Sequence, residues 1–165
     1  MSNKIFITGI AGFLGSHIAD KFLSMGWEVS GNDNLIGGYL DNVPKNTRFY
    51  EIDCNDLKAM TRAMKNTDIV FHTACTAYEG LSVFSPDLIC KNTYQIGVTT
   101  MTAAIKNNVK KFIHCSSMAR YGEHIKGNQP FKEDQECFPQ DPYGISKLAL
   151  EKLLKNLSEV HNIDL

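Results

Sequence analysis

Three glycines at three-residue intervals directly follow an apolar run near the N-terminus, and this pairing constrains the fold more than any other feature. The run is Ile5-Phe6-Ile7, and Gly9, Gly12 and Gly15 come next. Apolar residues then recur at helical spacing from Ser16 to Leu23. A strand that ends in glycines and continues as a helix presents backbone N–H groups and a positive helix end, which suit a dinucleotide pyrophosphate. A tight turn without a ligand would use the same glycines.

The bulk composition narrows the class of protein. With 165 residues, 43% hydrophobic and 21% charged, the chain is expected to form one domain over residues 1–165. A formal net charge of -1 gives no basis for binding nucleic acid. No apolar run reaches the roughly 18 residues of a membrane span, and no secretory leader is recognisable. We therefore expect a cytoplasmic protein without nucleic-acid or membrane partners.

The five cysteines are odd in number and form no C-x-x-C pair: Cys54, Cys75, Cys90, Cys115 and Cys137. This pattern favours neither a disulfide framework nor a zinc site. We expect buried free thiols and no metal site.

Apolar runs alternate with helical patterns along the chain. The expected strands are 4–8, 28–32, 47–52, 68–74 and 111–116, and the expected helices are 12–25, 57–65, 88–107 and 143–161. Strands that are apolar throughout indicate a parallel sheet covered on both faces. The predicted fold class is therefore α/β: a doubly wound parallel sheet, a Rossmann fold, with strand order 3-2-1-4-5 and ligands at the carboxyl ends of the strands.

Several strand ends carry residues suited to a cofactor. Asp33 lies eighteen residues after Gly15, where an acid can accept hydrogen bonds from an adenosine ribose and would repel a 2′-phosphate, so NAD is favoured over NADP. Asp53 could bind the adenine amino group, and the small residues of Thr73-Ala74 would let backbone approach the pyrophosphate. Each could equally be ordinary strand-end chemistry, and His72 could be a core histidine.

The start of the last helix carries a tyrosine and a lysine four residues apart, Tyr143 and Lys147, which places both on one face. A cation about 4 Å from a phenol contributes roughly 4 kcal/mol at moderate dielectric, about three pKa units. Tyr143 is therefore expected to act as a base near neutral pH, beside Ser117 at the end of the fifth strand. Taken alone, the spacing would also suit a surface pair.

The segment 121–141 is long, polar and rich in glycine and proline, which is typical of a functional loop.

Together these motifs resemble the extended short-chain dehydrogenase/reductase superfamily, in its NAD-dependent sugar-nucleotide epimerase/dehydratase branch. The matching segments are Thr8-Gly9-x-x-Gly12-x-x-Gly15, Gly31-x-Asp33-Asn34-Leu35, the strand end at Asp53, His72-x-Ala74, Phe112 to Ser117 with Tyr121-Gly122, and Pro142-Tyr143-Gly144-x-Ser146-Lys147. They run through most of the chain, from Thr8 to Lys147.

The resemblance implies a bound NAD that takes a hydride from a sugar carbon and returns it. Tyr143 would be the base, Lys147 would hold the nicotinamide ribose, and Ser117 would orient the sugar oxygen. The implied cofactor-binding residues are Gly9, Gly12, Phe13, Leu14, Gly15, Asp33, Asn34, Asp53, Cys54, His72, Thr73, Ala74, Asn92, Cys115, Tyr143 and Lys147. Glu79, in a segment that resembles a substrate loop, would contact the nucleotide sugar with Ser117 and Tyr143.

The residues after Ser117 bear on which reaction is expected. Met118-Ala119 follow it, where the dehydratases of the family carry acids that assist elimination, so an epimerase of the UDP-glucose 4-epimerase kind is favoured. Arg120 stands where the family usually has an apolar residue. A sugar-nucleotide dehydratase, a simple NAD-dependent dehydrogenase or reductase, and a non-catalytic NAD-binding regulatory scaffold remain alternatives.

The end of the chain departs from the family pattern. Family members continue from about Asn162 into a sixth strand and a substrate lobe, so we expect a truncated chain that binds NAD but turns over a sugar nucleotide poorly. The fifth strand would then be an unprotected edge. The family also pairs the helices equivalent to 88–107 and 143–161 across a dimer, which predicts a homodimer.

Overall fold

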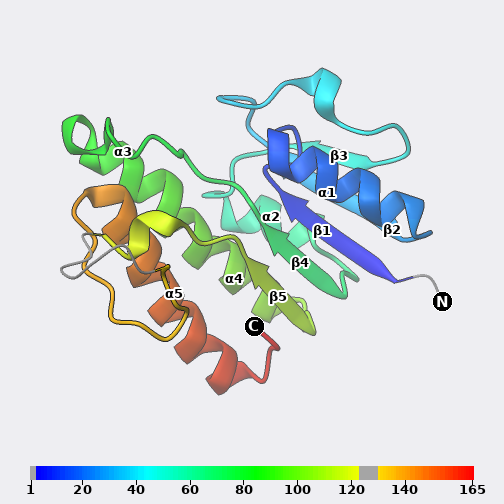
Figure 1. Cartoon of the computed structure of the whole chain (residues 1–165). Coiled ribbons are helices and arrows are strands. Elements are labelled where there is room, and N and C mark those ends of the chain that lie inside the picture. Colours follow the sequence, from blue (N-terminus) through cyan, green and yellow to red (C-terminus); the bar gives the residue numbers. More distant parts are fainter. Residues whose placement is uncertain (1–2, 123–129) are drawn as a thin grey trace.

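The computed structural model describes residues 3–122 and 130–165 and contains a five-stranded parallel sheet (Figure 1). The strands are β1 (Lys4–Thr8), β2 (Glu28–Asp33), β3 (Arg48–Glu51), β4 (Ile69–His72) and β5 (Lys111–His114). Their order in the sheet is β3-β2-β1-β4-β5. The predicted topology is confirmed, and the predicted strands are correct to within a few residues at each end.

The helices are close to those expected, with one difference. They are α1 (Phe13–Ser24), α2 (Leu57–Ala63), α3 (Pro86–Cys90), α4 (Ile96–Lys106) and α5 (Pro142–His161), with short 3₁₀ turns at η1 (Leu40–Asn42), η2 (Ser82–Phe84) and η4 (Met118–Arg120). The single helix expected over 88–107 is interrupted by the π-helical turn η3 (Lys91–Gln95). Of the polar segment 121–141, residues 123–129 lie outside the described residues.

Two apolar cores lie on opposite faces of the sheet. Ile5 and Ile7 of β1 pack with α1 on one face, while Phe6 between them packs on the other face with residues of α2, α4 and α5. All three side chains are fully buried. Alternation along a strand that is covered on both sides explains why the sequence is apolar at every position.

The start of α5 is fixed by its capping residue. The carboxylate of Asp141 accepts hydrogen bonds from the backbone N–H groups of Tyr143 (2.9 Å) and Gly144 (3.0 Å), and Pro142 occupies the first helical turn. Ser82 also donates to this carboxylate at 3.2 Å. A capping carboxylate satisfies N–H groups that have no partner within the helix. Tyr143 is thereby held in the first turn, facing the ends of the strands.

The outer edge of β5 is partly covered, contrary to the expectation of an unprotected strand. The N–H of Phe112 donates to the carbonyl of Asp164 at 2.8 Å, and the N–H of Asp164 donates to the carbonyl of Lys110 at 3.0 Å. Lys111 also forms a 2.7 Å ion pair with the Asp164 side chain. The last residues of the chain therefore begin a parallel pairing with β5.

The cysteines are free thiols, but only Cys54 is buried; Cys75, Cys115 and Cys137 are half-buried and Cys90 is exposed. The expectation of buried thiols is therefore wrong for four of them, since these four stand at strand ends, in a loop or on a helix surface rather than in the core. Among residues 3–122 and 130–165, no helix is long and apolar enough to cross a membrane. Nor does any cluster of metal-ligating side chains occur within those ranges.

Two histidines face each other behind the end of the sheet. His72 of β4 lies opposite His114 of β5, and their rings stack with centroids 5.6 Å apart. Thr8 bridges His72 and the backbone: its oxygen lies 2.8 Å from Nδ1 of His72 and accepts from the N–H of Ala74 at 3.2 Å. Burial, together with the charge of Lys147, lowers the pKa of His114 to about 3. Burial, His114 and Lys147 lower the pKa of His72 well below its usual value.

Both histidines are therefore neutral in the folded chain, and we predict a loss of stability in mild acid. The unfolded chain protonates these rings below about pH 6.5, so the free energy of unfolding falls by about 1.4 kcal/mol per pH unit for each histidine as the pH drops below that value. Urea unfolding between pH 7 and 4.5 measures this slope. His114→Phe should reduce it, whereas the exposed His161→Phe should not; equal slopes for wild type and His114→Phe would contradict the assignment.

Candidate functional site

The glycine turn after β1 brings backbone close to backbone. Gly9 has a φ of +69°, and a side chain on it would contact the backbone of Ala74 at 2.9 Å. A Cβ on Gly15 would lie 2.2 Å from the carbonyl oxygen of Gly9, so only glycine lets α1 approach β1 this closely. Gly12 caps α1 without a side-chain hydrogen bond, and the first turn holds no acidic residue. The positive end of α1 thus meets no negative side chain of its own helix.

A carboxylate stands beside this turn at the end of β2. Asp33 accepts from the N–H of Ala11 at 3.1 Å and from the N–H of Leu35 at 2.8 Å, one bond to each oxygen. It is 8% exposed and is held in a single orientation by these two bonds. A carboxylate accepts about four hydrogen bonds, so capacity remains for a ligand hydroxyl.

A second acid lies at the end of β3. Burial alone would raise the pKa of Asp53. Hydrogen bonds from Asn55 and Asn34 and the charge of Lys91 outweigh this effect, so the pKa of Asp53 is lowered. The side chain of Asn34 donates to Asp53 at 3.3 Å and thereby links the ends of β2 and β3. Asp33, Asn34 and Asp53 therefore form one polar border.

A cavity of about 500 Å³ runs along the carboxyl ends of the strands. It is lined by Gly9, Gly12, Phe13, Leu14, Gly15, Asn32, Asp33, Asn34, Ile36, Gly37, Gly38, Asp53, Cys54, Thr73, Ala74, Cys75, Thr76, Ala77, Tyr78, Asn92, Ile96, Cys115, Ser116, Tyr143 and Lys147. Residues from both halves of the chain thus meet in one cavity, at the edge of the sheet where parallel α/β folds bind ligands.

Three of the predicted site residues do not line this cavity. His72 is 1% exposed and lies behind the wall, hydrogen-bonded to Thr8, so its place is that of a core histidine supporting the strand ends. Ser117 follows two lining residues, and its hydroxyl lies near the phenol of Tyr143 and lowers the pKa of that phenol. Glu79 is exposed, and its charge acts on the phenol of Tyr143.

The ammonium group of Lys147 is held by a backbone carbonyl rather than by an acidic side chain. Lys147 is 2% exposed, and its Nζ donates to the carbonyl of Cys115 at 2.8 Å. The same Nζ lies 5.7 Å from the centre of the Tyr143 ring. Tyr143 itself is 6% exposed and packs against Cys75.

The expected lowering of the Tyr143 pKa is wrong for the chain without ligand. Burial, with smaller contributions from Cys75 and Glu79, raises the pKa of Tyr143 to about 12, although Ser117 acts in the opposite direction. The sequence argument assumed an ammonium about 4 Å from the phenol, but Lys147 is turned to the carbonyl of Cys115. Tyr143 is therefore protonated at neutral pH in this state.

Asn92 reaches the cavity from the π-helical turn η3. Its side-chain amide donates to the hydroxyl of Thr76 at 3.2 Å, and its backbone carbonyl accepts from the N–H of Thr76 at 3.1 Å. Single π turns inside α-helices are frequent at functional sites. This pair of bonds fixes the loop after β4 against the helix.

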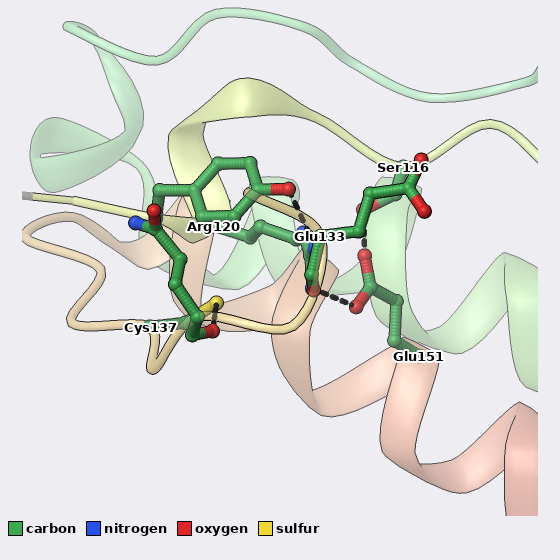
Figure 2. A network of polar contacts seen from close by, with 7 residues as sticks. Ser116, Arg120, Glu133, Cys137 and Glu151 are labelled. Atoms are coloured by element: carbon green, nitrogen blue, oxygen red, sulfur yellow. Dashed lines mark hydrogen bonds and ion pairs between the residues drawn. The ribbon is translucent and has the colours of Figure 1, made fainter. Parts of the chain in front are cut away.

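Sequence reasoning missed two groups of residues. The first is the segment Ile36–Gly38, which closes over the glycine turn: the N–H of Tyr39 and the side chain of Asn42 both donate to the carbonyl of Ala11. The Gly37-Gly38 pair could have indicated this segment, because glycines let backbone segments approach closely. The second is a polar network around Glu151, shown in Figure 2, for which no local motif exists.

Comparison with known proteins agrees with this geometry. The model of the NAD dependent epimerase/dehydratase family matches residues 5–165. UDP-glucose 4-epimerase of Streptomyces lividans is 30% identical over 166 residues, covering 99% of this chain and 50% of that protein. UDP-glucose 4-epimerase of Thermotoga maritima, solved with UDP-glucose, superposes with a TM-score of 0.92 at 34% identity, covering 97% of this chain and 52% of that one.

The enzyme from Thermus thermophilus, solved in complex with NAD, gives the same TM-score of 0.92 at 32% identity, with 97% and 52% of the two chains covered. The chain thus spans about half the length of the relatives it matches. Its sheet, its glycine turn and its Tyr143–Lys147 helix fall within the matched region. This chain belongs to the NAD dependent epimerase/dehydratase family.

Proposed function

We propose that this chain is the cofactor-binding half of an NAD-dependent nucleotide-sugar epimerase that acts at C4. The observation that carries the proposal is the single cavity in which the glycine turn, Asp33, Tyr143 and Lys147 meet. A dinucleotide needs an anion site, a ribose acceptor and a reactive end at successive places along one cleft. All three occur in this cavity: Asp33 at the end of β2, the glycine turn at the end of the neighbouring β1, and Tyr143 with Lys147 on α5.

The residues of the cavity fit NAD. The open first turn of α1, with Phe13 and Leu14 after Gly12, would receive the pyrophosphate. Asp33 and Asn34 would bind the adenosine ribose, and Asp53 the adenine edge. The remaining cofactor-facing groups would be Cys54, Thr73, Ala74, Asn92 and Cys115, all of which line the cavity.

When bound, NAD supplies hydride acceptance and return. At the other end of the cavity, Tyr143 would exchange a proton with the sugar hydroxyl, and Ser117 would hold the same oxygen. Lys147, whose ammonium has three N–H donors, would bind the nicotinamide ribose with those not given to Cys115. Since burial keeps Tyr143 protonated in the free chain, positive charge brought into the cavity is needed before Tyr143 can act as a base.

The residues that follow Ser117 favour epimerisation over elimination. The side chains of Met118 and Ala119 carry no ionisable group, so neither position supplies an acid for removal of water. The substrate class, a nucleotide sugar bound by Glu79, Ser117 and Tyr143, is inferred from the family and from relatives solved with UDP-sugars. We place the protein in the cytoplasm, in keeping with its free thiols.

We further propose a homodimer formed by α3, α4 and α5. Leu154 of α5 is buried against the sheet, but Ile145 and Val160 of the same helix are 52% and 64% exposed. Leu88 of α3 is 47% exposed. Apolar side chains on the outer side of these helices are suited to pairing with a second copy.

Cofactor binding is tested by Asp33→Asn, which removes the negative charge at nearly constant volume. We expect the wild-type chain to bind NAD more tightly than NADP, and the variant to lose roughly tenfold or more in NAD affinity because charged hydrogen bonds contribute about 1.5–3 kcal/mol. Titration calorimetry measures both affinities. Asp20→Asn, an exposed aspartate on α1, is the control. Equal NAD affinity in all three proteins would refute the role of Asp33.

Catalysis is tested by Tyr143→Phe. We expect the 165-residue chain to show little turnover of UDP-sugars by itself, because it spans about half the length of its relatives, and more when it is fused to the unmatched half of UDP-glucose 4-epimerase of Streptomyces lividans. In that protein, Tyr143→Phe should lower turnover by about 10²- to 10⁴-fold, the usual range for loss of an acid–base group. NAD affinity should stay within a few fold. Unchanged turnover in the variant would refute the role of Tyr143, and NAD binding without turnover in either protein would favour a scaffold that only binds NAD.

Dimerisation is tested by sedimentation velocity at micromolar concentration. We expect a species of twice the 18.5 kDa chain mass. Ile145→Glu places a charge on the proposed interface and should give monomers, whereas Met25→Glu changes an apolar side chain, 56% exposed, that follows α1 on the opposite face of the sheet. A wild-type monomer would contradict the proposal.

A further inference from the structure

Three consecutive residues after β5 each face a different residue of α5. The carbonyl of Cys115 accepts from Lys147, the hydroxyl of Ser116 donates to the carboxylate of Glu151, and the side chain of Ser117 lies near the phenol of Tyr143, whose pKa it lowers. On α5 the three partners are spaced by four residues, which places them in one row along the helix. Two of these contacts lie in the proposed reaction site, and the contact with Glu151 lies one turn beyond it.

Glu151 also reaches the far side of Ser117. Its second oxygen accepts from Nη1 of Arg120 at 2.9 Å, and Arg120 ends the short turn η4 that begins directly after Ser117 (Figure 2). The two side chains of this ion pair are only 17% and 25% exposed. One carboxylate therefore holds the chain both before and after Ser117.

We propose that Glu151 is a positioning residue of the reaction site: by binding Ser116 and Arg120 on either side of Ser117, it holds the Ser117 hydroxyl against the phenol of Tyr143. The inference rests on the proposed function for the identity of Ser117 and Tyr143 as reacting groups. The clamp itself is present in the chain without any ligand.

Arg120 is in turn held from several directions. Its Nη2 donates to the hydroxyl of Tyr121 at 2.7 Å and to the carbonyl of Glu133 at 3.3 Å. The guanidinium lies 4.3 Å from the centre of the Tyr121 ring, which stacks on Phe131. A guanidinium with its donors occupied in several directions keeps the partner carboxylate in place, because its planar fork loses little freedom per bond.

The charge of Glu151 matters for this arrangement because a carboxylate can accept from both partners at once. An uncharged hydroxyl or amide at the same position would satisfy Ser116 or Arg120 less well, and a methyl group would leave the Arg120 charge partly buried without its partner. The side-chain oxygen of Ser117 also accepts a hydrogen bond from the N–H of Ala119 at 3.1 Å. This amide reports directly on whether the Ser117 side chain stays in place.

The position of Ser117 also acts on the phenol. The groups that face Tyr143 are Cys75 and Glu79 from the segment after β4, Ser117 from the segment after β5, and Lys147 on its own helix. Among the groups that shift its pKa, Ser117 lowers it, while burial, Cys75 and Glu79 raise it. Loss of the Ser117 contact therefore changes the pKa of the Tyr143 phenol as well as the geometry of the site.

The test compares Glu151→Ala, Glu151→Gln and Ser116→Ala with Glu159→Ala, which removes an exposed glutamate from the same helix. Two quantities are measured by NMR in the free chain: the hydrogen-exchange rate of the Ala119 amide and the ¹³C shift of the ring carbon that bears the Tyr143 hydroxyl. We expect Glu151→Ala to raise the exchange rate on the order of tenfold, a local opening, and to move the Tyr143 resonance. Ser116→Ala should act in the same direction, and Glu151→Gln should give intermediate values.

The double variant Ser116→Ala with Glu151→Ala should be no worse than Glu151→Ala alone, because both changes break the same contact. Wild-type exchange and an unmoved Tyr143 resonance in Glu151→Ala would overturn the proposal. If Glu151→Ala does not fold, Ser116→Ala decides it by the same two measurements. Neither measurement needs NAD, so failure of cofactor binding would refute the proposed function and leave this test intact.

Discussion

A buried ammonium group constrains the C-terminal half of this protein. Lys147 is 2% exposed and carries its charge into the space between α5 and the end of β5. An unpartnered charge there would cost several kcal/mol, and the carbonyl of Cys115 supplies the contact at 2.8 Å. That bond fixes the direction in which the chain leaves β5, so Ser116 and Ser117 are delivered to the face of α5 that carries Glu151 and Tyr143.

The sequence was most informative where local geometry dictates residue type. The glycine turn, the apolar strands and the acid at Asp33 predicted a parallel sheet in its observed order, because each depends on a few neighbouring residues and on the period of the chain. The carboxyl ends of parallel strands lie at one edge of the sheet. Asp33 and Asp53 were therefore placed together correctly from the strand positions alone.

What the sequence did not predict depends on side-chain direction. The Tyr143–Lys147 spacing correctly placed both groups on one helix face, but it did not show that Lys147 turns toward a carbonyl and that burial dominates the pKa of the phenol. His72 matched a family motif, yet its side chain points behind the cavity wall toward Thr8. The pairing of Arg120 with Glu151 spans thirty-one residues and follows no short motif.

The π-helical turn η3 lies between α3 and α4, and the residues on its two sides contact different parts of the molecule. Before and within it, Cys90 approaches Ser146 of α5 and Asn92 faces the cavity; after it, Gly97 lies so close to Leu150 that a Cβ there would approach that side chain to 2.3 Å. One inserted residue rotates everything beyond it by about 100° around the helix axis. The wide turn thus lets the two parts of the helix keep different angular registers: the residues up to the turn face α5 and the cavity, and those after it face the core. Deletion of one residue would force both parts into a single register.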